Sequence, residues 1–415
     1  MLALTLSSQQ QHHSPLAHPC QEQIAMDNQG EGPVVSLSEP GIKAQGQLLH
    51  DMRREVASLL KRSSTGFPGA QPVSFARQHL DELAQHDYYV VEKSDGIRYL
   101  LYSTNDEGGN EAHYLIDRKN DFWYIPNRFF HCPTEASPTS FHTNTLIDGE
   151  LVWDTNADKK RVPVFLVFDC LVLDGALLME RTLDKRLAYF DQRFYRPYKR
   201  LYQEFPQELE FQPFIIEMKK PQFAYAIDMM FKEILPRLKH GNDGLIFTCR
   251  TTPYKHGTDN HILKWKPPEE NTIDCRLRLF FPTVEPTEAD RREGIAEPFT
   301  DYDSVPKADL YVYTGGNGPE KYEYFNPVYI TEEEWETLKS LNDPLDWRVV
   351  ECNIDEQGRW RILRFRDDKN EANHITTTKS VLQSIEDRVS EKDLYRAAGD
   401  IKNAWKARAS RTASR

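Results

Sequence analysis

The sequence predicts an α+β protein in which two strand-rich domains are flanked by helices. Between residues 88 and 267 most hydrophobic segments are short and rich in β-branched and aromatic residues, which is typical of strands. After Pro267-Pro268-Glu269-Glu270 the composition shifts to shorter strands with turn-rich loops, a pattern that favours a small β-barrel. The chain has 415 residues, of which 39% are hydrophobic, and this is enough for two separate cores.

The N-terminal part is expected to change from disorder to helix. Residues 1–42 are rich in Gln, His, Ser, Pro and Gly and predict a disordered tail. Residues 48–60 carry apolar side chains at helical spacing, and Phe67-Pro68-Gly69 ends that helix. Ser74 then has the position of an N-cap, so that a second helix is expected to start there.

The first domain is expected to span residues 43–268 and to consist mostly of strands. The segment 164–173 is apolar on both faces, which indicates a strand in the middle of a sheet. Helices are expected at about 184–194 and 223–239. The other expected strands are 88–91, 97–101, 114–118, 122–124, 145–153, 244–249 and 261–265.

The second domain is expected to span residues 269–375 and to form the β-barrel. Turn-rich loops such as Gly315-Gly316-Asn317-Gly318 separate its strands, and the proline-rich run before it indicates a hinge. The expected strands are 275–281, 309–313, 324–329, 349–352 and 360–365.

The last part of the chain, residues 376–405, is expected to form helices that pack back on the first domain. Apolar residues around Val381 follow helical spacing. Ser390, with Asp393 three residues later, has the pattern of a capping box at the start of the last helix. Residues 406–415 are basic and predict a solvated tail.

Charge and cysteine content exclude several classes of protein. The net charge of -12 argues against non-specific binding to nucleic acid, although clustered lysines and arginines can still form a local basic groove. The six cysteines are scattered without a CxxC pair, which supports neither a zinc site nor a disulfide framework and suits a reducing compartment. No segment has the length and apolarity of a membrane span or a signal peptide, so that a soluble intracellular protein without membrane contact is expected.

Residues 88–101 predict strand, tight turn and strand, with Lys93 where the first strand ends. Asp95-Gly96 supplies the turn, since Asp-Gly pairs are typical of sharp reversals and glycine tolerates left-handed backbone angles. A lysine in this position has two alternative roles. It either extends to solvent as a structural residue, or it is a desolvated amine whose lowered pKa makes it a nucleophile.

Charged residues interrupt several expected strands at positions that a plain core would fill with apolar groups. Asp148, Glu150, Asp169 and Asp243 lie within or beside apolar segments. Each has an ordinary alternative, since Asp-Gly pairs are usually turns. Together, carboxylates from neighbouring strands can hold a divalent cation through oxygen ligands.

Lys264 and Lys266 flank Trp265 within one strand and therefore point to the same face. With Lys93 they suit phosphate oxygens, and their mutual repulsion is expected to lower the pKa of one amine toward neutrality. A neutral amine that faces a metal-bound polyphosphate can attack phosphorus, while charge neutralisation and in-line positioning supply most of the rate. A solvated strand face is the alternative for these lysines.

A further basic segment lies beyond the hinge. Arg364 and Arg366 share one strand face and Lys369 follows, and arginine forks bind phosphate with two parallel hydrogen bonds. An exposed basic strand is the alternative. The sequence contains no P-loop, GxGxxG, GxSxG or HExxH motif, so that the common phosphate-binding loops and hydrolase sites are absent.

A series of blocks resembles, in order, the motifs of the covalent nucleotidyltransferases, the superfamily of mRNA capping enzymes and polynucleotide ligases. One such block alone is weak, whereas the ordered series is specific. The resemblance implies a nucleotidyltransferase domain of antiparallel sheets with flanking helices, followed by an OB-fold barrel. The blocks are Lys93-Ser94-Asp95-Gly96 with Arg98, Asp148-Gly149-Glu150, Phe168-Asp169, Asp243-Gly244-Leu245-Ile246, Leu263-Lys264-Trp265-Lys266-Pro267 and Arg364-Phe365-Arg366-Asp367-Asp368-Lys369.

Within the superfamily the chain is most similar to the mRNA guanylyltransferases, of the fungal α-subunit type. The last block is followed by Asn370-Glu371-Ala372-Asn373-His374, a capping-enzyme ending. The stretches 66–74 and 240–247 also resemble the fungal subunit. The resemblance extends over residues 44–400 and leaves the N-terminal tail outside.

The resemblance implies that Lys93 attacks the α-phosphorus of GTP, releases pyrophosphate and holds GMP as a phosphoamide. Asp95 and Gly96 form the turn that supports this nucleophile. Lys220 is an alternative to Lys219 for one of the nucleoside contacts. These implied contacts are Phe168 stacked on guanine, Lys219 at the base edge, Arg98 and Glu150 at the ribose, and Arg118 at the ribose or a phosphate.

The resemblance also implies a set of residues around the triphosphate and its Mg²⁺ or Mn²⁺. The basic block beyond the hinge reaches the phosphates only when the second domain closes, as a lid does. The implied residues are Lys264 and Lys266 at the α-phosphate, Asp243 and Glu150 at the metal, Asp274 as a further site residue, and Arg366, Asp368 and Lys369 at the β- and γ-phosphates.

The implied product is a GpppN cap on the 5′-diphosphate end of nascent pre-mRNA, and the implied location is the nucleus. His131-Cys132-Pro133 lacks the glycine-rich loop and arginine of a cysteine phosphatase, so that a separate RNA 5′-triphosphatase subunit is the expected partner. Binding to the phosphorylated C-terminal domain of RNA polymerase II is also implied. Two alternatives stay open: an ATP-dependent polynucleotide ligase, and an inactive relative that serves as a polymerase-tail adaptor.

Overall fold

The computed structural model describes residues 36–126, 130–316, 318 and 321–413. The disorder expected for residues 1–35 falls outside them. Residues 36–42, which were expected to belong to the tail, lie against a sheet: Tyr99 Oη donates a hydrogen bond to the Leu37 carbonyl at 2.7 Å, and β1 (Ile42–Lys43) pairs with β6 (Phe122–Ile125). A two-residue strand is too short to show a hydrophobic period, which is why the sequence does not indicate it.

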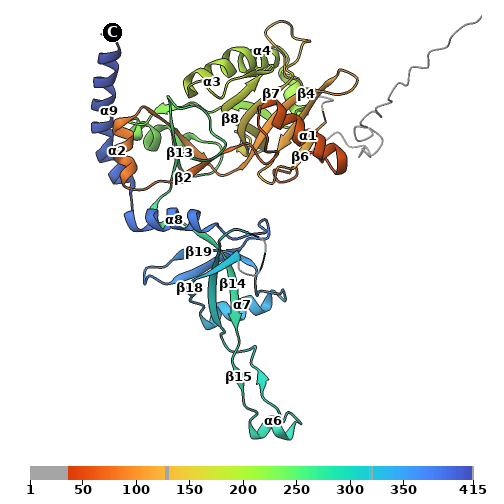
Figure 1. Cartoon of the computed structure of the whole chain (residues 1–415), viewed down its shortest axis with the longest axis vertical. Helices are drawn as coiled ribbons and strands as arrows, with labels where there is room; N and C mark the ends of the chain where they lie inside the picture. Colours follow the sequence, from red (N-terminus) through yellow and green to blue (C-terminus); the bar gives the residue numbers. More distant parts are fainter. Residues whose placement is uncertain (1–35, 127–129, 317, 319–320, 414–415) are drawn as a thin grey trace, which may run out of the picture.

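The first of two large sheets has the strand order β1-β6-β5-β4-β7-β8-β10, with β9 paired to β8 (Figure 1). Neighbouring strands are antiparallel except β8 and β10, which are parallel. The middle position expected for segment 164–173 is confirmed, because β8 has neighbours on both sides. The further bounds are β4 (Ile97–Asn105), β5 (Glu111–Ile116), β7 (Thr145–Thr155), β8 (Arg161–Leu173), β9 (Ala176–Leu177) and β10 (Ile215–Met218).

The second sheet has the order β11-β3-β12-β13-β2, and its β13 and β2 are parallel. The expected N-cap at Ser74 is wrong, since Ser74 ends strand β2 and pairs with Lys264, while α2 (Gln78–Gln85) begins later. Long-range strand pairing here overrides a local capping signal. The bounds are β2 (Ala70–Ser74), β3 (Tyr88–Ser94), β11 (Gln222–Phe223), β12 (Asn242–Cys249) and β13 (Gly257–Trp265).

Helices cover the sheets, and each of the four expected there has a counterpart with shifted bounds. Helix α1 spans Gly46–Leu59, and α3 (Leu183–Phe190) continues through a π-helical segment into α4 (Arg196–Glu204). The helix expected at 223–239 is shorter than expected, because Phe223 belongs to β11. A continuous helical segment then runs through α5 (Ile227–Met229), a π-helical stretch (Met230–Ile234) and a 3₁₀ turn (Leu235–Arg237). Pro236 in the last of these cannot donate an α-helical hydrogen bond.

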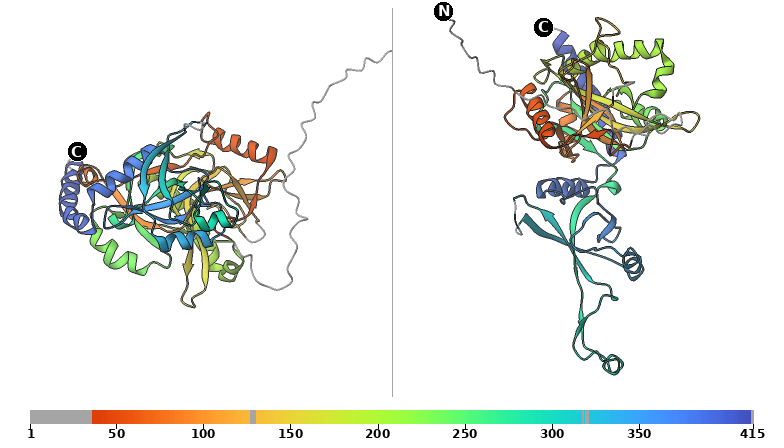
Figure 2. Two further views of the ribbon diagram at one scale, coloured as in Figure 1. Left: turned by 90° about the horizontal axis from the view of Figure 1, so that it is seen from below. Right: turned by 90° about the vertical axis from the view of Figure 1, so that its right-hand side faces the viewer.

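The expected β-barrel is confirmed beyond a 3₁₀ turn at Pro268–Glu270. Five strands close in the order β14-β17-β18-β20-β19, the first-second-third-fifth-fourth order of an OB-fold. An excursion with β15 (Thr283–Val284), α6 (Glu288–Arg292) and β16 (Phe299–Thr300) extends from the barrel as an arm (Figure 2). The bounds are β14 (Ile273–Phe280), β17 (Lys307–Tyr313), β18 (Tyr322–Val328), α7 (Glu332–Ser340), β19 (Val349–Ile354) and β20 (Trp360–Phe365).

Helix α8 (Ile375–Asp387) lies between the barrel and the second sheet. Val381 packs in the barrel core, while Ser384 Oγ donates a hydrogen bond to the Phe75 carbonyl at 2.7 Å. The expected capping box then begins α9: Ser390 N–H donates to Asp393 Oδ2 at 2.9 Å, and Asp393 N–H donates to Ser390 Oγ at 3.3 Å.

Helix α9 (Glu391–Ala413) packs against α2 and the second sheet (Figure 1). Leu394 and Ile401 contribute to the core there. The solvated tail expected from residue 406 differs from the structure, since α9 continues to residue 413 and Arg408 Nε donates to Asp87 Oδ1 at 2.9 Å. The basic end of α9 therefore anchors this helix to Asp87.

Separate apolar cores lie on the faces of the first sheet, beneath the second sheet and inside the barrel. The five cysteines in the described ranges are free and buried. None of the helices in these ranges combines the length and apolarity that a membrane span needs. The expected fold class, α+β with antiparallel sheets, flanking helices and an OB barrel, is confirmed.

Candidate active site

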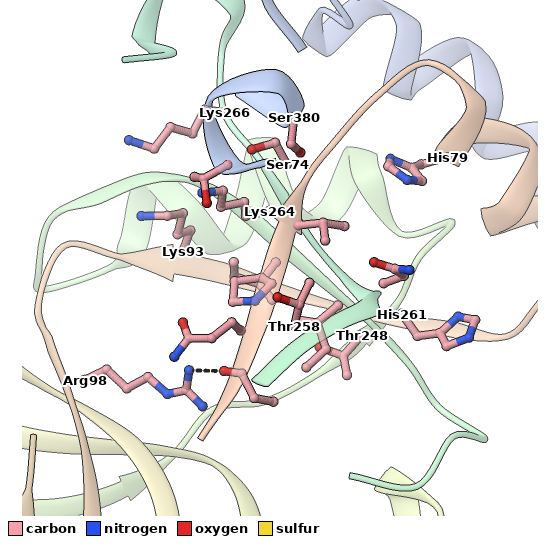
Figure 3. A pocket seen from close by; sticks show the side chains of 18 of the residues that line it. Ser74, His79, Lys93, Arg98, Thr248, Thr258, His261, Lys264, Lys266 and Ser380 are labelled. Atoms are coloured by element: carbon pink, nitrogen blue, oxygen red, sulfur yellow. Dashed lines mark hydrogen bonds between the residues drawn. The ribbon is translucent and has the colours of Figure 1, made fainter. Parts of the chain in front are cut away.

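The two sheets and the barrel surround one cavity of 1380 Å³. Figure 3 shows Lys93, Lys264 and Lys266 next to one another, with Arg98 further along the wall. Three expected site residues do not line the cavity themselves but lie next to residues that do, namely Asp95, Gly96 and Asp368. The expected site residues on the wall itself are Lys93, Arg98, Arg118, Glu150, Phe168, Lys219, Asp243, Lys264, Lys266, Asp274, Arg366 and Lys369.

The turn after Lys93 is fixed by backbone contacts. Asp95 N–H donates to the Gly241 carbonyl at 2.9 Å, which ties the turn to the start of β12. A Cβ on Gly96 would lie 2.6 Å from the Leu151 carbonyl oxygen, and Gly96 does not have a positive φ. Glycine is therefore required by the close approach of β7, and not by the left-handed backbone that the sequence analysis assumes.

Asp243 holds two of the three lysines. Lys93 Nζ lies 2.6 Å from Asp243 Oδ1, and Lys266 Nζ lies 2.6 Å from Asp243 Oδ2. Burial would raise the pKa of Asp243, but the two ammonium groups outweigh burial and lower the pKa. The side chains of Lys93 and Lys266 are each 25% exposed, so that both amines face the cavity without being sealed from it.

Lys264 is the third lysine of this cluster and lacks an anionic partner. Within the part of the chain that the structure describes, no hydrogen bond or ion pair reaches its Nζ. Burial lowers the pKa of Lys264 to about 8, and repulsion from Lys93, Lys266 and Arg118 adds to this. The lowered pKa expected for one of the three amines is thus that of Lys264.

Arg98, expected at the ribose, is held in a buried ion pair. Its Nε and Nη2 donate to the two carboxylate oxygens of Asp148 at 2.9 and 2.6 Å, and Nη1 donates to the Ala70 carbonyl. Tyr254 Oη donates to the same carboxylate at 2.6 Å. Asp148 is fully buried. These contacts join the first sheet to β2, and they leave Asp148 unavailable as the cation ligand that the strand pattern suggests.

Asp169 is occupied in the same way. Arg186 Nε and Nη2 donate to its two oxygens at 2.7 and 2.8 Å. Asp148 and Asp169 face each other in register across β7 and β8, yet each is neutralised by its own arginine. Asp148 and Asp169 are thus occupied by ion pairs, which leaves Asp243 and Glu150, the residues that the resemblance implies at the metal, as the carboxylates available to a cation. Arg186 is a functional neighbour that the sequence analysis misses.

Lys219 lines the same cavity and contacts the residues on either side of Lys93. Its Nζ donates to the Ser94 hydroxyl, is 3.6 Å from Glu150 Oε2 and lies 5.9 Å from the centroid of the Phe168 ring. Lys219 is buried and lines the cavity, whereas Lys220 is exposed and is not among the lining residues. This position supports Lys219 rather than Lys220 as the base contact.

Arg118 follows strand β5 at the edge of the cavity. Its side chain is exposed, and among the described residues no carboxylate or hydrogen-bond acceptor binds it. An arginine without a partner on a cavity wall is available for a ribose or phosphate oxygen of a ligand.

On the barrel side, Asp274 of β14 binds the basic side chains of the last motif. Arg366 Nη1 donates to Asp274 Oδ1 at 2.9 Å, Lys369 Nζ donates to Oδ2, and Asn373 Nδ2 donates to Oδ2 at 3.1 Å. Arg366 Nε and Nη2 also donate to Asp368 at 2.8 and 2.7 Å. A buried carboxylate with three donors anchors those side chains. Asn373 is a further residue that the sequence analysis quotes without assigning a role.

The order of motifs and the architecture indicate one class of protein. Lys93 and its partners lie between two largely antiparallel sheets, and an OB barrel presents Arg366 and Lys369 to the same cavity. This combination defines the covalent nucleotidyltransferases.

The chain belongs to the mRNA capping enzyme family. A family model of the mRNA capping enzyme catalytic domain matches residues 36–268, and one of the mRNA capping enzyme C-terminal domain matches residues 270–395. The mRNA-capping enzyme subunit alpha of Neurospora crassa is 59% identical over 384 residues, which cover 91% of this chain and 96% of the relative. The subunit of the same name from Schizosaccharomyces pombe is 44% identical over 377 residues, covering 90% of each.

These matches confirm the family expected from the motifs and do not favour the ligase alternative. A solved structure of a mycobacterial DNA ligase D complexed with ATP and MES is 15% identical, with a TM-score of 0.33, and covers 73% of this chain and 95% of that chain. This similarity is too low to bear on the assignment.

Proposed function

We propose that the protein is the guanylyltransferase of mRNA capping and that Lys93 carries GMP as a covalent intermediate. The observation that supports this best is the cluster of Lys93, Lys264 and Lys266 on the cavity wall, of which Lys93 and Lys266 pair with Asp243. Three neighbouring amines with a single carboxylate between two of them suit the oxygens of a nucleoside triphosphate. Lys93 has the position of the nucleophile in the motif.

In the first step Lys93, which pairs with Asp243 as an ammonium in the free protein, gives up a proton to solvent and its amine attacks the α-phosphorus of GTP. A P–N bond forms, the bond to the bridging oxygen breaks, pyrophosphate leaves and the amine releases a second proton to solvent. Lys264 and Lys266 stabilise the charge on the α-phosphate, and the Asp243 carboxylate orients the amine at 2.6 Å. In the second step a terminal oxygen of a 5′-diphosphate RNA attacks the same phosphorus, the P–N bond breaks and GpppN-RNA forms.

A divalent cation, Mg²⁺ or Mn²⁺, fits the donors of this cavity. Asp243 is ionised because its pKa is lowered, and Glu150 is half-buried on the same wall. Ionised carboxylate oxygens are the ligands that hard divalent cations take. Bound there, the ion would neutralise charge on the phosphates.

The guanosine is proposed to lie toward Phe168 and Lys219. The half-buried Phe168 ring offers a stacking surface, and Lys219 offers a donor to the base edge. Glu150 binds the ribose directly. Arg98 acts as a positioning residue below it, because its guanidinium is already held by Asp148 and lies 5.5 Å from the Phe168 centroid.

The proposed division of labour is a nucleotidyltransferase domain at residues 43–268 and an OB-fold domain at 269–375 that closes over the triphosphate. The relatives are named as alpha subunits, which supports a separate RNA 5′-triphosphatase subunit as partner. We further propose that the phosphorylated C-terminal domain of RNA polymerase II delivers the nascent RNA, and that the protein acts in the nucleus.

Incubation with α-labelled GTP and Mg²⁺ is expected to place the label covalently on the protein, and α-labelled ATP is not. Acid should release the label, because a phosphoamide bond is acid-labile. The measurement is autoradiography of the denatured protein. Labelling from ATP but not GTP would identify a ligase, and labelling from neither nucleotide would identify an inactive adaptor.

Triphosphate binding is expected to take up a proton near pH 8. The pKa of Lys264 is about 8 in the free protein, and a bound phosphate raises it. Below pH 7 Lys264 is protonated with or without the bound triphosphate, so that binding takes up few protons. Above pH 8 the uptake on binding approaches one proton. In that range the affinity for the triphosphate falls by up to about tenfold per pH unit. Calorimetry with an α,β-methylene analogue of GTP in buffers of different ionisation enthalpy measures this.

Lys264→Met supplies the control for this measurement. It should bind the analogue more weakly and lose the proton uptake above pH 8, while retaining any uptake that belongs to the ligand. Equal uptake in both proteins would show that another group titrates.

A further inference from the structure

One outer face of the barrel carries aromatic and arginine side chains that the proposed chemistry does not use. Along β14 and β17 the inward residues form the barrel core, and the residues between them point outward. We call the outward set the aromatic face. It consists of Arg276, Arg278 and Phe280 on β14, Tyr311 and Tyr313 on β17, Tyr322 and Tyr324 on β18, and Trp347 before β19.

The register of the strands places these side chains side by side. Arg276 is opposite Tyr311, and Tyr311 is opposite Tyr324. The ring of Trp347 lies 5.7 Å from that of Tyr311, and the guanidinium of Arg278 lies 5.7 Å from the Trp347 ring. Aromatic rings and arginines therefore alternate across a continuous surface.

Trp347 is presented in an unusual backbone conformation. Its φ is +65°, which bulky residues rarely adopt. Its N–H donates to the Leu277 carbonyl at 2.7 Å, and its carbonyl accepts from Arg276 Nη1 at 2.6 Å. Trp347 is 38% exposed and lies outside the barrel core. Backbone strain that presents an exposed aromatic ring is typical of a functional surface.

The aromatic face is continuous with the cavity. Asp274 and Arg276 point to the same side of β14, and Asp274 lines the cavity and anchors Lys369. Arg276 Nη2 donates to the carbonyl of Asn370, the residue after Lys369. A polymer whose end lies at the lysine cluster can thus leave the cavity along β14.

We propose that the aromatic face binds the single-stranded part of the RNA acceptor, with bases stacked on Trp347 and Tyr324 and phosphates bound by Arg276 and Arg278. This rests on the proposed function, since it places the substrate of the second step. Rings that alternate with cations hold single strands without reading their sequence. The face includes β17 and β18, the second and third strands of the OB order, which OB-folds use for oligonucleotides.

Carboxylates border the two arginines. Arg278 Nη1 lies 3.0 Å from Asp346 Oδ2, and Arg276 Nη2 lies 3.6 Å from Glu371 Oε2. The Arg278–Asp346 pair is exposed on both sides, and exposed ion pairs stabilise little, so that a phosphate can replace Asp346. Arg276, whose side chain is 18% exposed, is the less accessible of the two arginines. Stacking is therefore expected to supply most of the affinity, with a weak dependence on salt.

The test compares Tyr324→Ala and Trp347→Ala with the parent protein, each first loaded with labelled GMP. The acceptors are a 5′-diphosphate dinucleotide and a 5′-diphosphate RNA of about 15 nucleotides, a length at the upper end of OB-fold sites. Each variant should raise the KM for the longer RNA about tenfold, the effect of losing one stacked base. Loading with GMP and transfer to the dinucleotide should not change.

Tyr329→Ala is the matched control. Tyr329 is 44% exposed and has the Arg359 guanidinium 4.0 Å from its ring, but it follows the other end of β18 and lies outside the aromatic face. Both acceptors should react with it as with the parent protein.

Equal KM values for the longer RNA in Tyr324→Ala and the parent would overturn the proposal. Tyr324 is 52% exposed, so that this variant tests the face even if Trp347→Ala does not fold. A parent protein that forms no lysyl-GMP would instead refute the proposed function. Fluorescence anisotropy with the longer RNA would then decide on the face alone: unchanged binding by Tyr324→Ala refutes it, and about tenfold weaker binding supports it.

Discussion

Lys93→Ala is expected to abolish the covalent GMP adduct, with a loss of at least about 10⁴-fold in the rate of labelling. The variant lacks the only atom that can bond to the α-phosphorus in the proposed first step. Lys264 does not replace it, because Lys264 lies on β13, which β12 separates from β3 and its turn. Lys266 does not replace it either, because Lys266 remains bound to Asp243. Labelling with α-labelled GTP measures the loss, and an adduct that persists at another lysine would contradict the assignment.

The same substitution is expected to leave the fold intact. Asp243 retains Lys266 at 2.6 Å, so that no half-buried carboxylate loses all its partners. The lost pair is partly exposed, and its contribution to the free energy of unfolding is about 0–1 kcal/mol. Thermal unfolding measures this. Lys220→Ala, which removes an exposed lysine beside the cavity, should match the parent in both labelling and stability.

The sequence predicts well those parts of this protein whose structure is determined by residues close together in the chain. The barrel strands alternate in hydrophobicity and are separated by strong turns, so that each is predicted within a few residues. The turn at Asp95-Gly96 and the paired lysines around Trp265 are also local. Because such signals carry the motif, Lys93, Lys264 and Lys266 were all expected to face one cavity, and they line one.

The partners of charged residues depend on contacts that the sequence does not display. Asp148 is bound by Arg98 and Tyr254, which are 50 and 106 positions away, and a carboxylate on a strand looks the same with or without them. The sequence therefore does not reveal that Asp148 and Asp169 belong to buried ion pairs and are not open to a ligand. The helix expected at 223–239 begins later than predicted for a similar reason, since Phe223 pairs with Tyr89 of β3 far away in the chain.

Arg366→Ala is expected to slow the formation of lysyl-GMP about 10²–10³-fold, which corresponds to about 2.7–4 kcal/mol of transition-state stabilisation. Arg366 is proposed to bind the β- and γ-phosphates, which leave as pyrophosphate. These phosphates take part only in the first step, so that transfer of GMP from loaded enzyme to RNA should change little. Single-turnover rates of the two steps measure the difference.

The two acidic partners of Arg366 explain how it can exchange a carboxylate for a phosphate. Hydrogen bonds from Arg366 lower the pKa of Asp368 to about 2, but the Asp368 side chain is 65% exposed, and an exposed pair is easily exchanged. Asp274 is only 8% exposed and also holds Lys369. A carboxylate repels phosphate, and we therefore propose that Asp274 and Asp368 act through the basic residues that they bind.

This arrangement makes the Arg366 prediction specific to one step. Asp274→Asn removes the charge that anchors Arg366 and Lys369, and it should therefore impair the same first step, to a smaller extent than Arg366→Ala. Arg359→Ala, which removes an arginine paired with Asp355 at the start of β20, should leave both steps unchanged. If Arg366→Ala slows both steps equally, Arg366 binds the RNA or stabilises the barrel. If only the first step slows, the barrel contributes to catalysis by holding the leaving group, and its closure belongs to lysyl-GMP formation alone.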